Sequence, residues 1–159
     1  MISNMPIELT DNKLKLIEEL GVLYEQGGMQ PAAARISSLL LVSDQTELTF
    51  EEIYETLHLS KSATSNALNY LLSTGRVEYI THPGERRRYF RCKLQSLKEG
   101  VQKSLISIGA FNDIIKKVLA QRPYSTKEFN ANLEQVSDFL DFIIKELPAL
   151  FQKWEDSRK

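Results

Sequence analysis

The sequence predicts a mainly α-helical fold with one small β-hairpin. Across most of its 159 residues, apolar side chains recur at steps of three and four, the period of a helix face. Glycine, proline and Ser/Thr capping patterns divide these stretches into separate helices. One region instead alternates apolar and polar residues on both sides of a Pro-Gly pair, which is typical of two paired strands.

Glycine and proline mark the limits of the first two helices. Apolar spacing predicts a helix over residues 11–26, and Gly27-Gly28 ends it because glycine accepts the left-handed conformation. Pro31 suits the first turn of a second helix, where a missing N–H costs no hydrogen bond. The segment AAARISSLLLVS then predicts a buried helix, and a short extended piece follows at 47–49.

The next segment combines two short helices with the hairpin. Thr49-Phe50-Glu51-Glu52 is a capping box that begins a third helix, and Ser60 can cap a fourth helix that ends at Ser73-Thr74-Gly75. Strands are expected at 77–81 and 88–93, around a tip that contains Pro83-Gly84. This order predicts a helix-turn-helix followed by a β-wing.

Two long helices are expected in the C-terminal third. Capping boxes at Ser96…Glu99 and Ser125…Glu128 predict where they begin, and the first should end near Gln121. Pro148 should kink or interrupt the second near Leu147. The second carries a heptad pattern of apolar residues, namely Leu133, Val136, Leu140, Ile143, Leu147, Leu150 and Trp154, widened by Phe139, Phe142, Ile144 and Phe151.

Composition excludes several classes of protein. No apolar run approaches the roughly 20 residues of a membrane span, and the first residues do not resemble a signal peptide. We therefore expect a cytoplasmic protein with no membrane partner. One cysteine excludes an intrachain disulfide, and neither His58 nor His82 has the partners of a metal site. No nucleophile motif or phosphate-binding glycine loop appears, so we expect no catalytic residues, no metal and no cofactor.

The charge distribution is more informative than the net charge of −1. Residues 57–93 hold seven cations and two anions, whereas residues 43–56 hold five anions and no cation. Positive charge thus gathers on the fourth helix and the hairpin. Such a patch favours nucleic acid, although a charge cluster is also common on a surface that faces only solvent.

One face of the fourth helix is polar and free of acids. Asparagine can bond adenine bidentately in the major groove, and serine can reach bases or phosphates. Arginine on a thin hairpin can enter a narrow minor groove. We predict base reading by Ser62, Ser65, Asn66 and Asn69, phosphate contacts by Lys61 and Arg76, and minor-groove or backbone contacts by Arg86, Arg87 and Arg88. The alternative is a winged-helix module that binds proteins and not DNA.

The stretch from Pro31 to Lys93 resembles MarR-type winged helix-turn-helix regulators. The segments GMQPAAARISSLLLVS, LSKSATSNALNYLLSTGRVEYI and PGERRRYF are most similar to the GbsR-like branch. The resemblance implies that the helix at 60–73 enters the major groove and that Arg86 or Arg87 is the wing arginine, with Glu85 two residues before Arg87. Many members have arginine where this chain has Asn66, so the base preference of the family does not carry over directly.

The resemblance also implies a homodimer that binds a double-stranded operator and acts as a repressor released by a small-molecule effector. We accordingly predict N-terminal dimerisation residues at 1–30, the DNA-binding domain at 31–95 and C-terminal dimerisation helices at 96–159. The heptad helix supports a dimer, although it can also close the core of one subunit. Four residues are candidates for an effector pocket or, more simply, for core packing: Tyr24, Met29, Phe111 and Tyr124. Cys92 fits a small buried side chain better than a redox sensor.

Overall fold

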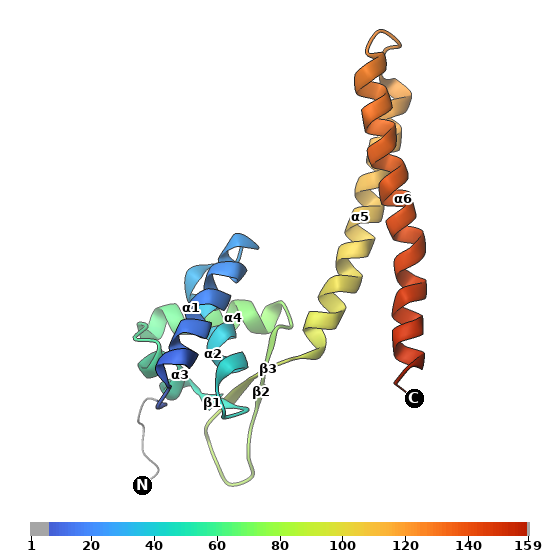
Figure 1. Cartoon of the computed structure of the whole chain (residues 1–159). Coiled ribbons are helices and arrows are strands. Elements are labelled where there is room, and N and C mark those ends of the chain that lie inside the picture. Colours follow the sequence, from blue (N-terminus) through green and yellow to red (C-terminus); the bar gives the residue numbers. More distant parts are fainter. Residues whose placement is uncertain (1–6, 159) are drawn as a thin grey trace. The chain divides into compact units, whose positions relative to one another are not determined.

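A computed structural model describes residues 7–158 and divides the chain into two compact units, one up to Leu97 and one from Lys98 (Figure 1). Each unit is described by itself. The mainly helical fold with a small antiparallel wing, expected from the sequence, is confirmed. Within the described part, no helix is long and apolar enough to cross a membrane.

The first unit contains the elements expected for a winged helix-turn-helix. Its helices are α1 (Asp11–Gln26), α2 (Pro31–Val42), α3 (Phe50–Thr56) and α4 (Lys61–Ser73), and its strands are β1 (Leu48–Thr49), β2 (Val77–Ile80) and β3 (Tyr89–Cys92). Helix α1 has the predicted bounds, and α2 begins at Pro31 as predicted. Thr10 caps α1, and Pro31 occupies the first turn of α2.

Side-chain caps hold the two helices of the helix-turn-helix. The Thr49 hydroxyl accepts the Glu52 N–H at 3.2 Å, and the Glu52 carboxylate accepts the Thr49 N–H at 2.7 Å, as the capping box predicts. The Ser60 hydroxyl accepts the Ala63 N–H at 3.1 Å and begins α4. Between the helices, His58 adopts a left-handed φ of 52°, which ends α3 and turns the chain toward α4.

The wing is part of a three-stranded sheet in the order β1-β3-β2. β2 and β3 pair antiparallel, with Tyr79 opposite Phe90, as the alternation of apolar residues predicts. β3 also pairs with β1, which places Leu48 opposite Phe90. The sequence predicted the extended piece but not its partner, because a two-residue strand has too few side chains to show which strand it joins.

Helix α2 is central to the first unit and packs against α1, α4 and β3. Ile36 and Leu39 are fully buried in a core that continues into the helix-turn-helix and wing through Ile53, Leu71 and Phe90. On the other side, the Arg35 guanidinium of α2 binds Glu18 and Glu25 of α1 and crosses Gly21. A Cβ at Gly21 would lie 2.8 Å from Arg35 Cδ, so a larger residue there would displace this link.

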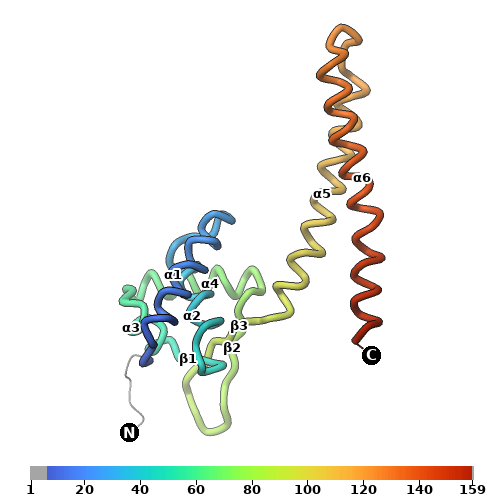
Figure 2. Tube along the Cα trace, in the orientation of Figure 1, coloured from blue at the N-terminus to red at the C-terminus, as the bar shows by residue number. Residues whose placement is uncertain are grey.

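The second unit is a hairpin of two long helices, α5 (Gln95–Gln121) and α6 (Lys127–Asp156), whose paired course is clear in Figure 2. Both predicted capping boxes are wrong. α5 begins before Ser96, because the turn at Lys93 leads directly into the helix, and α6 has Thr126 as its N-cap without a capping side-chain hydrogen bond. The Thr126 hydroxyl instead donates to the Pro123 carbonyl at 3.1 Å.

Pro148 does not interrupt α6, so of the kink or interruption expected near Leu147 the interruption is wrong. The helix continues to Asp156 with the proline inside it. Proline removes one intrahelical hydrogen bond and costs roughly 3 kcal/mol. The helical turns on both sides of Pro148, in a helix of 30 residues, supply enough hydrogen bonds and packing to outweigh that cost.

The apolar side chains of α6 fall into a half-buried group and an exposed group. Leu140 and Leu147 are half-buried, whereas Phe139 and Phe142 are 61% and 60% exposed. α5 likewise exposes an apolar row of its own. We call six of the exposed apolar side chains of the two helices the hairpin apolar face; they are Phe111, Ile114, Val118, Val136, Phe139 and Phe142.

Buried polar side chains join the two helices of the hairpin. Asn112 of α5 is 1% exposed, and its amide donates to the Ser137 carbonyl at 3.3 Å and to the Asp141 carboxylate at 2.8 Å. In return, the Ser137 hydroxyl donates to the Asn112 side-chain oxygen at 2.8 Å. Lys116 binds the same Asp141 carboxylate at 2.8 Å. These bonds match Asn112 to one turn of α6 and so set the register of the hairpin.

Replacing Asn112 by alanine is expected to lower the free energy of unfolding by about 1–3 kcal/mol, because the buried Ser137 hydroxyl loses its acceptor. The loss appears as a lower midpoint in urea unfolding followed by circular dichroism. Asn132→Ala is the control, because it removes the same amide side chain from an exposed position of α6. It is expected to change the free energy of unfolding by less than about 0.5 kcal/mol. Equal stability of the two variants would contradict a register role for Asn112.

Candidate nucleic-acid interface

Helix α4 presents the polar face that the sequence predicts. Ser62, Ser65, Asn66 and Asn69 are all exposed. The opposite face is buried through Leu68 and Leu71, and Leu71 belongs to the fully buried core. Burial of that apolar face therefore determines which polar side chains of α4 point outward.

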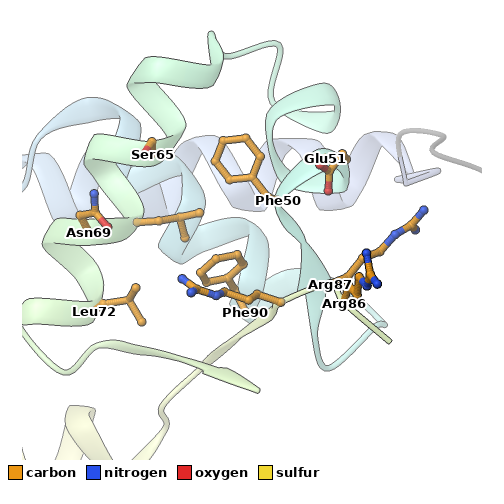
Figure 3. Close-up of a pocket in the computed structure, with 10 residues that line it drawn as sticks. Phe50, Glu51, Ser65, Asn69, Leu72, Arg86, Arg87 and Phe90 are labelled. Carbon is orange, nitrogen blue, oxygen red and sulfur yellow. The ribbon is translucent and has the colours of Figure 1, made fainter. Parts of the chain in front are cut away.

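A cavity of about 430 Å³ joins α4 to the wing (Figure 3). Ser65 and Asn69 line it from α4, while Arg86, Arg87 and Arg88 line it from the wing. Its apolar lining consists of Phe50, Leu68, Leu72 and Phe90. The structure thus brings five of the nine predicted DNA-binding residues to a single recess.

The three wing arginines differ in their surroundings. All three are exposed, but the Arg88 guanidinium lies 4.9 Å from the centre of the Tyr79 ring. In the described part of the chain, Arg86 and Arg87 form no ion pair. Arg91, also on the hairpin, binds Glu78 across the strands at 2.6 Å. Arg86 and Arg87 are therefore the wing cations with the greatest freedom to meet a phosphate or a groove.

Several contacts anchor the base of the wing. His82 binds the Glu47 carboxylate from the loop before β1, and its ring lies 4.8 Å from the Tyr89 ring in an edge-on arrangement. The Tyr89 hydroxyl donates to Glu85, and this hydrogen bond raises the pKa of Tyr89. Glu85, the acid before the wing arginines, thereby ties the tip of the hairpin to β3.

The other predicted DNA-binding residues lie outside this cavity. Lys61 is exposed at the start of α4, with its ammonium 5.4 Å from the centre of the Tyr54 ring. Asn66 lines a different groove beside Tyr70 and the first turn of α2. Arg76 follows α4, and its charge acts on the Tyr24 hydroxyl, so it lies on the side of the unit where α1 ends.

Two residues with a role at this surface were missed from the sequence. Glu51 lines the cavity beside the wing arginines, although its segment had been assigned only to helix capping. Tyr79 supports Arg88 from β2. The alternation of β2 could have indicated Tyr79 as an outward aromatic side chain, whereas no local signal links Glu51 to a wing more than thirty residues later.

Of the four residues considered for an effector pocket or for core packing, two pack in the core and two are exposed. Met29 is buried in the core and Tyr24 packs against it, which confirms core packing for these two. Phe111 and Tyr124 are 60% and 92% exposed, so core packing is wrong for them. Cys92 is half-buried against the core, and burial raises the pKa of its thiol, which disfavours the reactive thiolate.

Comparison with known proteins agrees with this geometry. The family model described as "MarR family" matches residues 27–88, from the end of α1 to the wing arginines. This matched part, 62 of the 159 residues of the chain, is similar to the MarR family. The match ends at Arg88, so it includes every predicted DNA-binding residue and leaves out all of α1 and the helical hairpin.

The individual proteins that this chain is similar to are distant in sequence. It is 22% identical to the HTH-type transcriptional regulator MmpR5 of Mycobacterium tuberculosis (strain ATCC 25618 / H37Rv) over 130 residues, which cover 82% of this chain and 79% of that protein. It is also similar to a crystal structure titled as a transcriptional regulator, with a TM-score of 0.65 and 20% identity. That match covers 91% of this chain and 99% of the other and shows a shared fold.

Proposed function

We propose that the protein is a homodimeric transcriptional regulator that reads a palindromic DNA site with α4 and the wing. The observation that carries this proposal is the joint cavity of Ser65 and Asn69 with Arg86, Arg87 and Arg88. Amide and hydroxyl groups can read base edges, while guanidinium groups neutralise phosphates beside the groove. Lys61 and Arg76 would add phosphate contacts at the two ends of α4.

The homodimer is proposed from the hairpin apolar face. A monomer rarely leaves so many large apolar side chains exposed on two adjacent helices, and a second copy of the chain would bury them. We propose that residues 96–159, together with residues 1–30, supply this contact around a DNA-binding domain at 31–95. Two copies of α4 spaced about one turn of DNA, roughly 34 Å, would then read two half-sites.

Three finer features rest on the family resemblance. We propose membership of the GbsR-like branch, action as a repressor, and release of DNA by a small-molecule effector. The similarity of residues 27–88 to the MarR family supports regulation in general, and the sequence segments around α2, α4 and the wing support the branch. An effector would act by favouring a dimer whose two recognition helices are wrongly spaced for the operator.

Binding to random duplex DNA is expected to weaken steeply with salt. In fluorescence anisotropy with a duplex of about 30 base pairs, log K should fall linearly with log salt by about 0.9 per phosphate neutralised. Measurements of the full chain between roughly 50 and 200 mM salt give this slope. Absence of binding near the lower concentration, or binding that ignores salt, would instead favour the protein-interaction module.

Selection of bound duplexes from a random pool then tests whether the protein reads DNA as a dimer. Two inverted half-sites with centres about 10 base pairs apart are expected for a dimer that uses both α4 helices. A single unpaired half-site would contradict the dimeric arrangement while leaving DNA binding intact.

A further inference from the structure

We propose that Glu51 is an internal competitor for the DNA phosphates and lowers the affinity of the wing arginines for any duplex. This inference rests on the proposed DNA-binding function and assigns a new role to one residue of α3. The competition is electrostatic. A carboxylate in the recess neutralises part of the positive potential that would otherwise attract a phosphate.

The position of Glu51 is what distinguishes it from the neighbouring acids. Glu51 is half-buried and lines the same cavity as Arg86, Arg87 and Arg88. Figure 3 shows Glu51 on the same side of the view as Arg86 and Arg87, with Ser65 and Asn69 of α4 on the other side. The DNA backbone would have to pass this carboxylate to reach both the wing and α4.

Glu51 also differs from Glu52 in what its carboxylate does. Glu52 accepts hydrogen bonds from the N–H of Thr49 at 2.7 Å and from its hydroxyl at 2.8 Å, so its oxygens serve the cap of α3. Among the described residues, Glu51 has no hydrogen-bond or ion-pair partner. Its place in the first turn of α3 suits the positive end of the helix dipole, and its unpaired charge is also available to act across the cavity.

The size of the cavity favours an effect across it. A cavity of about 430 Å³ is roughly one Debye length across, about 8 Å at physiological ionic strength, so salt screens charges around it only in part. A phosphate that enters the recess meets three cations and one anion. Removing the anion would let the same surface neutralise about one more phosphate charge per protomer.

Glu51→Gln tests this idea because it removes the charge and keeps the shape. In anisotropy with a random duplex, we expect about three- to tenfold tighter binding and a salt slope steeper by up to about 0.9 per protomer. Glu19→Gln is the matched control, since Glu19 is an exposed acid on α1 outside the cavity. It makes the same change in net charge and should alter affinity by less than about twofold.

Two further variants separate charge from structure. Glu51→Asp keeps the carboxylate and should bind with the wild-type salt slope, whereas a purely structural role would be disturbed by the shorter side chain. In a chain that already carries Arg86→Ala and Arg87→Ala, Glu51→Gln should tighten binding far less than in the wild type, because two of the three arginines that share its cavity are gone.

The outcomes are distinct from those that test DNA binding itself. If the wild-type protein binds duplex with a clear salt slope, but Glu51→Gln matches Glu19→Gln in affinity and slope, the competitor role is wrong and the proposed function stands. Full tightening by Glu51→Gln without Arg86 and Arg87 would also overturn it. If the wild-type protein binds no duplex at low salt, the proposed function fails first.

Discussion

Replacing Arg86 and Arg87 together by alanine is expected to weaken operator binding by roughly a thousandfold. The two residues are exposed wing cations at the cavity shared with α4. A dimer would lose four phosphate or groove contacts, and at about 1 kcal/mol each the loss is about 4 kcal/mol. The salt slope should fall at the same time, by up to about 0.9 for each phosphate contact removed.

Anisotropy with the duplex selected from the random pool measures this loss, and sedimentation shows that the dimer persists. The matched control compares single variants on the same hairpin. Arg91→Ala removes a cation that Glu78 already binds, so it should cost much less than Arg87→Ala. Unchanged operator affinity in the double variant would rule out the wing as a DNA-binding element.

Replacing Phe139 and Phe142 together by glutamine is expected to dissociate the dimer. Each ring is about 60% exposed in the single chain. Covering that exposed part removes about 100 Å² of apolar surface per ring, or about 2.5 kcal/mol at 25 cal/mol per Å². Four rings per dimer then contribute about 10 kcal/mol, which exceeds the roughly 8 kcal/mol of a micromolar dissociation constant.

Sedimentation equilibrium distinguishes monomer from dimer directly. The double variant should sediment as a monomer at micromolar concentration and should bind a palindromic duplex only as weakly as one half-site allows. Tyr124→Gln, in the turn between α5 and α6, is a control because this side chain is 92% exposed and lies outside the hairpin apolar face. A double variant that remains dimeric would show that another surface joins the copies.

Much of the first unit follows from local signals. The capping box at Thr49, the cap at Ser60 and the proline at Pro31 placed three helix starts correctly, because each depends on side chains within four residues of the backbone they bind. The same approach failed at Ser96 and Ser125. There, turns involving Lys93 and Pro123 determine where the helices begin, and a short motif does not record those contacts.

The residues of the candidate interface were predicted together with their roles toward DNA, but their contacts with one another and with the rest of the unit were not. Exposure of Ser65 and Asn69 followed from the helical period of α4, since the apolar residues between them had to be buried. The sequence did not indicate that Arg88 lies on Tyr79, that Glu78 binds Arg91, or that Glu51 shares the recess. Each of these contacts joins residues from different elements or opposite strands.

The sequence alone thus specifies the helices, the wing and the polar face of α4, because side-chain periodicity and end caps act over one or two turns of chain. Only the tertiary structure decides which cations of the wing are free and which acid opposes them. That decision depends on the pairing of β3 with both β1 and β2 and on the packing of α3 against α4. Charges separated widely along the chain then meet at one cavity, where their interaction depends on distance and burial and not on sequence separation.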